Sequence, residues 1–345
     1  MASINDITIN ITMNTKSLSV KGFGLPLILG SRPLEDELCE VYGEYASLEE
    51  MTAAGYDSES KEYGLASKIF AQSPHPEVVA VYCREEDASI ADGLDELVMT
   101  KNDWYALLIT ERGGEALAKA GDWCAAHEKI FFGCAASVSA LTGRNNDREA
   151  YVIHDEPDTY PEAAWVGLCL PKPIGSITWK WKSPSGVPAA GFSTTQLNEI
   201  RRANGQTFTR RSGAIYSNEG KVTSGEYIDN IMSRDYVKAR LEEGLLSLAL
   251  KSDKVGMDDD GLSKIHAKMK EVLDGCGEDG IIAEVGSEED ARKSDEGKYM
   301  YTISVPTRAQ IPENDRAKRK VSGIKFSFTI SGAVHEMPVN GTIEI

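Results

Sequence analysis

The stretch "PEVVAVYC" (residues 76–83) is a short apolar run rich in β-branched valine. A run of this kind beside turn residues is typical of a strand that is buried on both faces. Three further stretches share this character: "DWYALLIT" (103–110), "KIFFGCA" (129–135) and "EAYVIH" (149–154). Sequences with helical periodicity lie between and around them. This alternation predicts an α/β core with a largely parallel sheet.

A tryptophan-rich stretch follows this core. "SITWKWKSPSG" (176–186) alternates tryptophan with lysine. Because successive side chains of a strand point to opposite faces, the alternation predicts a strand with one covered face. Trp179 and Trp181 would share that face, and the lysines would lie on the other.

Helical periodicity returns in the C-terminal half. "TTQLNEIRRANG" (194–205) predicts a helix that Asn204 or Gly205 ends in the left-handed conformation. Two longer apolar stripes predict helices at 235–250 and 261–275. Strand-like sequences then follow at 298–305, 323–332 and 338–345. The fold class expected for the whole chain is therefore α/β, or α+β overall.

The N-terminal end also has strand character. In "ITINITMN" (7–14) apolar and polar residues alternate at the period of a half-buried strand. No turn signal follows that would fold the strand back onto a partner of its own. Since soluble proteins normally cover or pair such an edge, we expect this strand to find its partner elsewhere.

Length and charge limit the classes of function. The 345 residues suit two domains better than one, and the net charge of −17 argues against nucleic acid as a partner. The charge is uneven: 35–62 holds ten acids, whereas the sequence from Lys298 onward holds seven basic residues and four acids. An acidic front and a basic end make copies of the chain complementary to one another.

Motifs for catalysis, cofactors or membrane insertion are not evident. The sequence contains no GxSxG, P-loop, HExxH or GxGxxG motif, and its six cysteines are scattered without a CxxC pair. "MDDDG" (257–261) fails as an EF-hand loop, because Met269 stands where the bidentate glutamate belongs. No stretch has the length and character of a signal peptide or membrane span. We expect a soluble protein without cofactor or metal, not an enzyme.

Lysines on the helix expected at 261–275 form the clearest basic feature. Lys264 and Lys268 are four residues apart and so lie side by side, with Lys270 nearby. Like charges at this spacing cost a few tenths of a kcal/mol, so they suggest an acidic partner surface. A solvated lysine face explains the pattern equally well. "NDRAKRK" (314–320) is a second basic run, expected as a turn or short helix between strands.

Two long stretches carry a family resemblance. The sequence from "GKVTSGEYIDN" to "GEDGIIA" (220–283) resembles the C-terminal region of contractile bacteriophage tail sheath proteins, a family also found in R-type bacteriocins and related injection machines. "NDRAKRKVSGIKFSFTISGAVHEMPVNGTIEI" (314–345) resembles the end of the same family, and "DITINITMN" fits its beginning. The resemblance covers both ends and the 190–345 half.

The resemblance implies a structural polymer of stacked six-fold rings around an inner tail tube, which contracts to drive the tube through a cell envelope. The expected domains are an N-terminal arm and linker (1–21), an outer α/β region (22–225), a tube-proximal domain (226–333) and a C-terminal arm (334–345). The arms would pair with neighbouring subunits. The residues expected to pair are Ile7, Ile9, Ile11, Met13, Val339, Thr342, Ile343 and Ile345.

Further roles follow from the resemblance alone. Lys16 and Lys21 would belong to one flexible arm linker, and His335 and Pro338 to the other. Lys264, Lys268 and Lys270 would face the tube, with the 314–320 turn as the rival. The implied partners are other copies of the chain, the tube protein, and baseplate and tail terminator proteins, with no nucleic acid and no membrane insertion. The implied location is the virion tail, assembled in the bacterial host cytoplasm.

Two other interpretations remain open at this point. The chain could be a discrete α/β enzyme or ligand-binding protein whose terminal strands close its own sheet. It could also be the sheath of a bacteriocin or another injection machine and not of a phage. The first alternative predicts a discrete monomer or dimer with a defined pocket.

Overall fold

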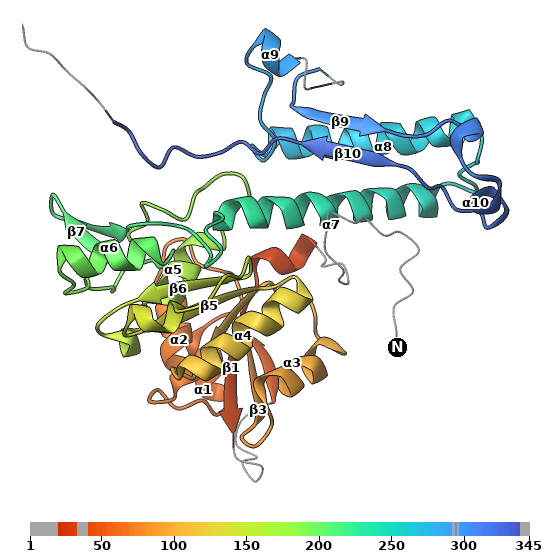
Figure 1. Ribbon diagram of the computed structural model, residues 1–345. Helices are drawn as coiled ribbons and strands as arrows, with labels where there is room; N and C mark the ends of the chain where they lie inside the picture. Colours follow the sequence, from red (N-terminus) through yellow and green to blue (C-terminus); the bar gives the residue numbers. More distant parts are fainter. Residues whose placement is uncertain (1–19, 33–40, 292–293, 295–296, 339–345) are drawn as a thin grey trace, which may run out of the picture.

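A mostly parallel sheet forms the centre of the larger part of the molecule. The computed structural model describes residues 20–32, 41–291, 294 and 297–338. Its main sheet has six strands in the order β2-β3-β1-β4-β5-β6, all parallel except β2 at the edge (Figure 1). The strands are β1 (Pro26–Arg32), β2 (Tyr42–Tyr45), β3 (Val79–Glu85), β4 (Ala106–Ile109), β5 (Ile130–Ala135) and β6 (Glu149–Ile153). The predicted α/β core is confirmed.

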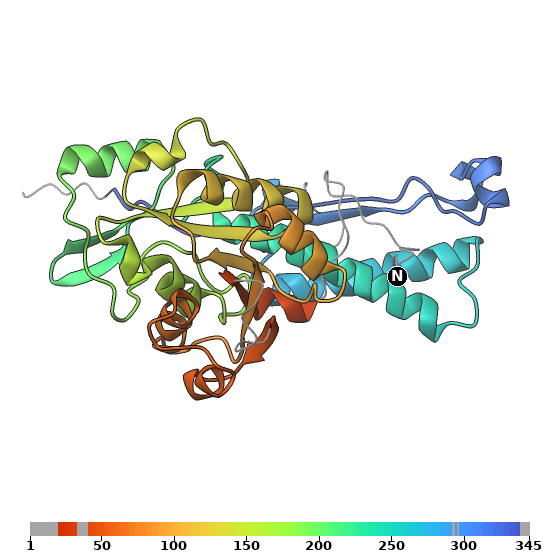
Figure 2. The same cartoon turned by 90° about the horizontal axis from the view of Figure 1, so that it is seen from below.

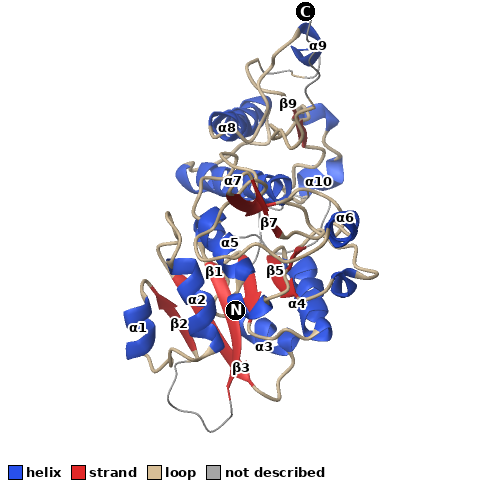
Figure 3. Cartoon of the chain, turned by 90° about the vertical axis from the view of Figure 1, so that its left-hand side faces the viewer, coloured by secondary structure: helices blue, strands red, loops and turns tan. Residues whose placement is uncertain are grey.

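Helices cover both faces of this sheet, so its strands are buried on both sides (Figure 3). One face packs against α1 (Leu48–Ala53), α2 (Lys61–Phe70) and α5 (Pro161–Cys169). The other face packs against α3 (Ile90–Val98), α4 (Gly114–His127) and α6 (Thr194–Arg202). Ser47, Ser60 and Ser89 cap α1, α2 and α3 through their side chains, which fixes where these helices begin.

A second, smaller unit contains the C-terminal helices and strands. α7 (Ile228–Lys251) and α8 (Asp259–Glu278) lie side by side, and the antiparallel pair β9 (Tyr301–Ser304) and β10 (Lys325–Phe328) covers α8 (Figure 1). A separate apolar core joins α7, α8 and the two strands. The short helices α9 (Glu288–Ala291) and α10 (Glu313–Ala317) extend from this unit. A hairpin of β7 (Phe208–Arg211) and β8 (Ala214–Ser217) follows α6 in the chain.

The remaining elements are short 3-10 helices: η1 (Val20–Gly24), η2 (Val138–Leu141), η3 (Pro157–Thr159) and η4 (Arg308–Gln310). Within the described ranges, no helix has the length and apolar character to cross a bilayer.

Buried ion pairs attach α7 to the sheet. The Asp235 carboxylate on α7 accepts hydrogen bonds from the Arg148 guanidinium and, at 2.6 Å, from the Tyr105 hydroxyl. Lys238, one turn further along, donates to both oxygens of Glu128 at 2.7 and 2.9 Å. The first half of α7 packs into the sheet's core and its second half into the smaller core. The two units therefore share one helix.

Three local expectations have different outcomes. Asn204 takes the left-handed conformation (φ 57°) after α6, as predicted, and a short helix occupies part of the 314–320 run. The strand predicted at 176–186 is wrong, because the backbone at Trp181 turns to the left-handed region (φ 63°) and reverses the alternation. As a result Trp179 is buried, whereas Trp181 is 46% exposed.

Candidate assembly surfaces

The β9–β10 pair is the surface with open strand edges. Lys325 pairs with Ser304 at one end of the ladder and Phe328 with Tyr301 at the other. The apolar side chains of both strands face α8, and the polar ones face outward. In the part of the chain that the structure describes, no other strand lies along the outer edge of β9 or β10; bridges to 282 and 284 occur only beyond their ends. Each edge can accept an added strand.

Close contacts with α8 hold this small sheet in place. A Cβ at Gly277 would lie 2.5 Å from the ring of Tyr299, so only glycine allows this approach of helix and strand. The Tyr301 hydroxyl donates to Asp274 at 2.5 Å and also lies 3.3 Å from Lys270 Nζ. Burial, reinforced by the Asp274 hydrogen bond, raises the pKa of Tyr301 to about 12. The sheet is thus presented as a rigid surface.

The segment after β10 returns to the larger unit and is bound there through His335. Nδ1–H of His335 donates to the Glu219 carboxylate at 3.1 Å, and Nε2 lies 2.7 Å from Thr178 Oγ1. The imidazole also contacts the ring of Tyr227 edge-on, with centroids 4.5 Å apart. Thr178 lies 3.4 Å from Asp229, and burial raises the pKa of that carboxyl. These contacts fix the chain at His335.

The neighbours of His335 are exposed. Glu336 pairs with Arg201 on α6, while Val334 and Met337 are 65% and 71% exposed. The structure therefore places the predicted linker residue His335 in contact with the body of the molecule, with Pro338 three residues beyond this contact.

The N-terminal linker and the arms are described only in small part. Lys21 falls in η1. Lys16 and all eight predicted arm residues lie outside the described residues: Ile7, Ile9, Ile11, Met13, Val339, Thr342, Ile343 and Ile345. Their pairing and the bending of either linker stay predictions.

The three lysines of α8 each have an acidic neighbour on the same helix. Lys264 Nζ lies 2.7 Å from Asp260, Lys268 Nζ 2.5 Å from Glu271, and Lys270 Nζ 3.7 Å from Asp274. Lys264 is exposed, whereas Lys270 turns toward Tyr301 of the small sheet. The lysines therefore do not form one continuous basic row, and their contact with a tube stays a prediction.

The rival basic run lies at the far end of the molecule from the β7–β8 hairpin (Figure 2). Lys318, Arg319 and Lys320 follow α10 and are all exposed. Within the described ranges, none of the three forms an ion pair. The backbone of Arg319 is left-handed (φ 56°), which ends the short helix and turns the run outward.

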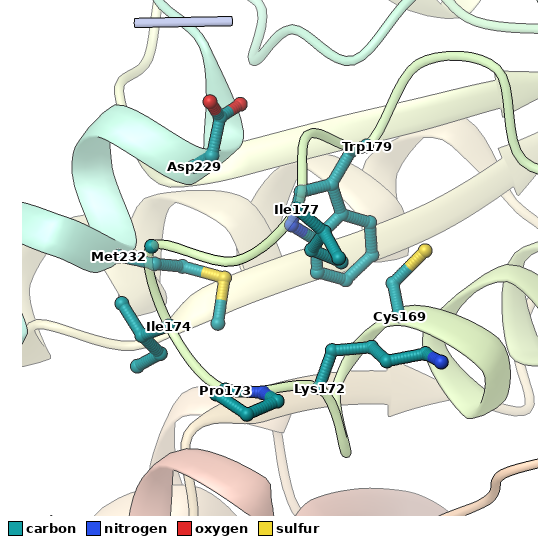
Figure 4. A pocket seen from close by; sticks show the side chains of 9 residues that line it. Cys169, Lys172, Pro173, Ile174, Ile177, Trp179, Asp229 and Met232 are labelled. Carbon is teal, nitrogen blue, oxygen red and sulfur yellow. The ribbon is translucent and has the colours of Figure 1, made fainter. Parts of the chain in front are cut away.

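A small hollow lies beside the His335 contact (Figure 4). Its volume is only about 10 Å³, roughly what one water needs, and it is lined mainly by Cys169, Pro173, Ile174, Trp179 and Met232, with Asp229 at its rim. Typical ligand pockets measure ~300–1,000 Å³ and carry several convergent polar groups. This hollow is smaller and largely apolar.

Comparison with known structures identifies the fold as that of contractile sheath proteins. The chain matches the helical sheath of the anti-feeding prophage in its contracted state with a TM-score of 0.69 at 14% identity, over 99% of both chains. The sheath complex of an extracellular contractile injection system, PVC, also contracted, matches with a TM-score of 0.67 at 11% identity, over 100% and 99%. A sheath tail protein from Desulfitobacterium hafniense matches with a TM-score of 0.57 at 8% identity, over 87% and 93%.

The sequence itself matches a family model over its C-terminal third only. Residues 228–343 match the family model described as E217 tail sheath protein gp31-like, C-terminal domain. No curated protein matches the chain. The resemblance to contractile tail sheath proteins is thus confirmed, from the sequence in the C-terminal third and from the fold elsewhere.

Proposed function

We propose that this chain is the subunit of a contractile sheath, polymerised as stacked six-fold rings around a tail tube. The observation that carries this proposal is the β9–β10 pair, whose two outer edges are open in the described part of the chain. The chain supplies a strand-like sequence at each end, so the arms of neighbouring copies can fill both edges. At ~0.5–1.5 kcal/mol net for each main-chain hydrogen bond, a few bonds per arm give strong linkage when repeated through a polymer.

The sheath-type fold over the whole chain supports this assignment, as does the match of 228–343 to a tail sheath domain. One of the similar structures comes from a contractile baseplate, matched with a TM-score of 0.68 at 12% identity. We therefore infer that the subunit also meets a baseplate at one end of the sheath; a terminator at the other end follows from the family resemblance alone. The proposed role of such a subunit is structural, and it requires neither catalysis nor a cofactor.

Removal of the first arm tests the assignment. A chain without residues 1–15 should remain folded and soluble but should not polymerise, whereas the full-length protein should form rings or hollow tubes in negative-stain electron microscopy. The chain with Ile7, Ile9 and Ile11 all changed to Asp is a matched control of full length. It should behave like the truncation, because the arm would lose its apolar face. A truncated chain that unfolds would instead favour a strand internal to the subunit.

The tube contact has two candidate surfaces. We propose that Lys264, Lys268 and Lys270 of α8 face the tube, with 318–320 as the competing surface. Exposed charge pairs are worth ~0–1 kcal/mol each, weak enough for a contracting sheath to release them together. Reversal of the α8 lysines to Glu should reduce co-sedimentation with the tube protein. If only reversal at 318–320 does so, the basic run that includes these residues (314–320) faces the tube.

A further inference from the structure

Helix α7 carries an apolar stripe that continues past the sheet that covers it. In the first half of the helix, Ile228, Met232 and Ala239 lie in the core of the main sheet. Leu246 follows Ala239 by seven residues and Leu250 follows by four more, which keeps both leucines on the same side of the helix. They are 48% and 78% exposed, so the described part of the chain leaves this end of the stripe uncovered. We name Leu246 and Leu250 the open leucines.

The smaller core does not cover the open leucines either. Val237 and Leu241, which belong to that core, lie on the opposite side of α7. A Cβ at Gly244 would lie 2.7 Å from Val272, which marks the side of α7 that faces α8. Single exposed apolar residues are normal on a protein surface, but these two extend a stripe that is buried elsewhere. The stripe therefore indicates that an apolar segment lies along this part of α7.

The chain itself brings such a segment to this place. The ring of Phe23 in η1 lies edge-on to that of Tyr236 on α7, with centroids 5.7 Å apart, and Figure 1 shows η1 (red) against α7. Nineteen residues precede Val20 in the sequence and lie outside the described residues. Their only charged side chains are Asp6 and Lys16. An apolar segment thus joins the molecule close to the point where the stripe becomes uncovered.

This segment is long enough to reach the open leucines. Leu250 follows Tyr236 by 14 residues, which is about 21 Å along the helix. An extended chain rises ~3.3 Å per residue, so about seven residues span this distance. Counting back seven residues from Val20 gives Met13, which alternates with Ile11 in the apolar pattern of the arm. A tether this short gives an effective concentration of ~1 mM, which favours the chain's own segment over that of a second copy.

We propose that the N-terminal segment of the unassembled subunit packs against the open leucines of its own α7, with Ile11 and Met13 over them. The contact itself needs only one chain, whereas its consequence rests on the proposed sheath function. The same two side chains are expected to pair with a neighbouring subunit, so the arm has to leave α7 before it can do so. The open leucines therefore compete for the arm and restrain assembly.

A cross-link in the unassembled subunit tests the contact. Met13→Cys is combined with Leu250→Cys, and Cys39 is changed to Ser, because the five other native cysteines are buried. The protein is treated with a short bismaleimide below the polymerising concentration. The cross-link should close the chain on itself, which a denaturing gel detects as a faster-migrating monomer.

The matched control combines Met13→Cys with Val334→Cys. Val334 is 65% exposed and adjoins His335, whose ring contacts Tyr227 at the start of α7. That end of the helix is ~14 Å from Tyr236, closer than Leu250, so an arm that moves freely would reach Val334 at least as often. The Leu250 pair should instead close roughly fivefold more often. Equal closure of the two pairs, or cross-linked dimers without closed monomers, would overturn the contact.

The variant Leu246→Glu/Leu250→Glu tests the restraint. Both leucines are exposed, so the change leaves the two cores intact. Release of the arm should lower the concentration needed for polymerisation about tenfold, equivalent to ~1.4 kcal/mol. Ser247→Glu, which adds a charge to another side of the same turn, should polymerise like the wild type. Unchanged or weaker polymerisation of the leucine variant would overturn the restraint, whereas closed monomers of a protein that never polymerises would support the contact and refute the sheath function.

Discussion

Asp235 is the residue on which the attachment of α7 depends, and its removal should be costly. The Arg148 side chain is 2% exposed and that of Asp235 11%, so the pair is shielded from solvent. Asp235→Ala would leave the guanidinium buried without a counter-charge and would also remove the acceptor of the Tyr105 hydroxyl. Loss of one partner of a buried pair typically costs ~3–5 kcal/mol. A single domain has only ~5–15 kcal/mol of stability, so this is a large fraction.

Urea unfolding followed by circular dichroism, below the polymerising concentration, measures this loss. The matched control is Arg240→Ala on the same helix, whose pair with Glu243 at 3.9 Å is exposed; it should cost less than ~1 kcal/mol. The double variant Arg148→Met/Asp235→Leu should recover most of the loss, because apolar residues of similar volume replace a buried pair with little penalty. A loss below ~1 kcal/mol for Asp235→Ala, or a double variant no better than the single one, would refute the reasoning.

Three further changes test other parts of the structure. Gly277→Ala should destabilise the protein by ~1–3 kcal/mol in the same urea assay, because the new Cβ would meet the Tyr299 ring; an unchanged midpoint would contradict this. Burial lowers the pKa of Lys129 from 10.5 to about 7, so the unfolded chain binds more protons between these values and stability should rise with pH across that window. Relative to Lys129→Met, the melting temperature of the wild type should therefore increase from pH 7 to pH 10; a constant difference would exclude the shift. His335→Ala should speed cleavage after Glu336 by a glutamate-specific protease several-fold while leaving the melting temperature within about 2 °C, a change of under ~1 kcal/mol, and unchanged cleavage would show that the contact does not hold the segment.

The main sheet could be predicted because its central strands carry a strong local signal. The runs at 76–83, 103–110, 129–135 and 149–154 have apolar centres, as strands buried on both faces require, and β3 to β6 overlap them. The local signal for β1 is weaker, since Pro26 and Gly30 interrupt its apolar pattern and Gly22 and Gly24 lie just before it. Its place in the centre of the sheet comes from long-range pairing with β3 and β4.

Parts of the candidate surfaces could be predicted only where the pattern of a single continuous segment determines the structure. The strand character of 298–305 and 323–332 anticipated β9 and β10. The His335 contact joins residues 116 and 157 positions away, and no local pattern indicates such a distance. At Trp181 the local pattern was regular but the prediction was wrong. The alternation of tryptophan and lysine predicted that Trp181 is covered, whereas its left-handed backbone turns the side chain toward solvent. A single φ angle therefore decided whether this residue belongs to the core or to the surface.

The sharing of α7 between the two cores has a mechanical consequence. At 24 residues the helix is about 36 Å long, and its first half packs against the six-stranded sheet while its second half packs into the small unit. Because one continuous helix belongs to both cores, it resists hinge bending between the two units. In the proposed polymer, a pull on the edges of β9 and β10 would therefore be passed along α7 to the six-stranded sheet.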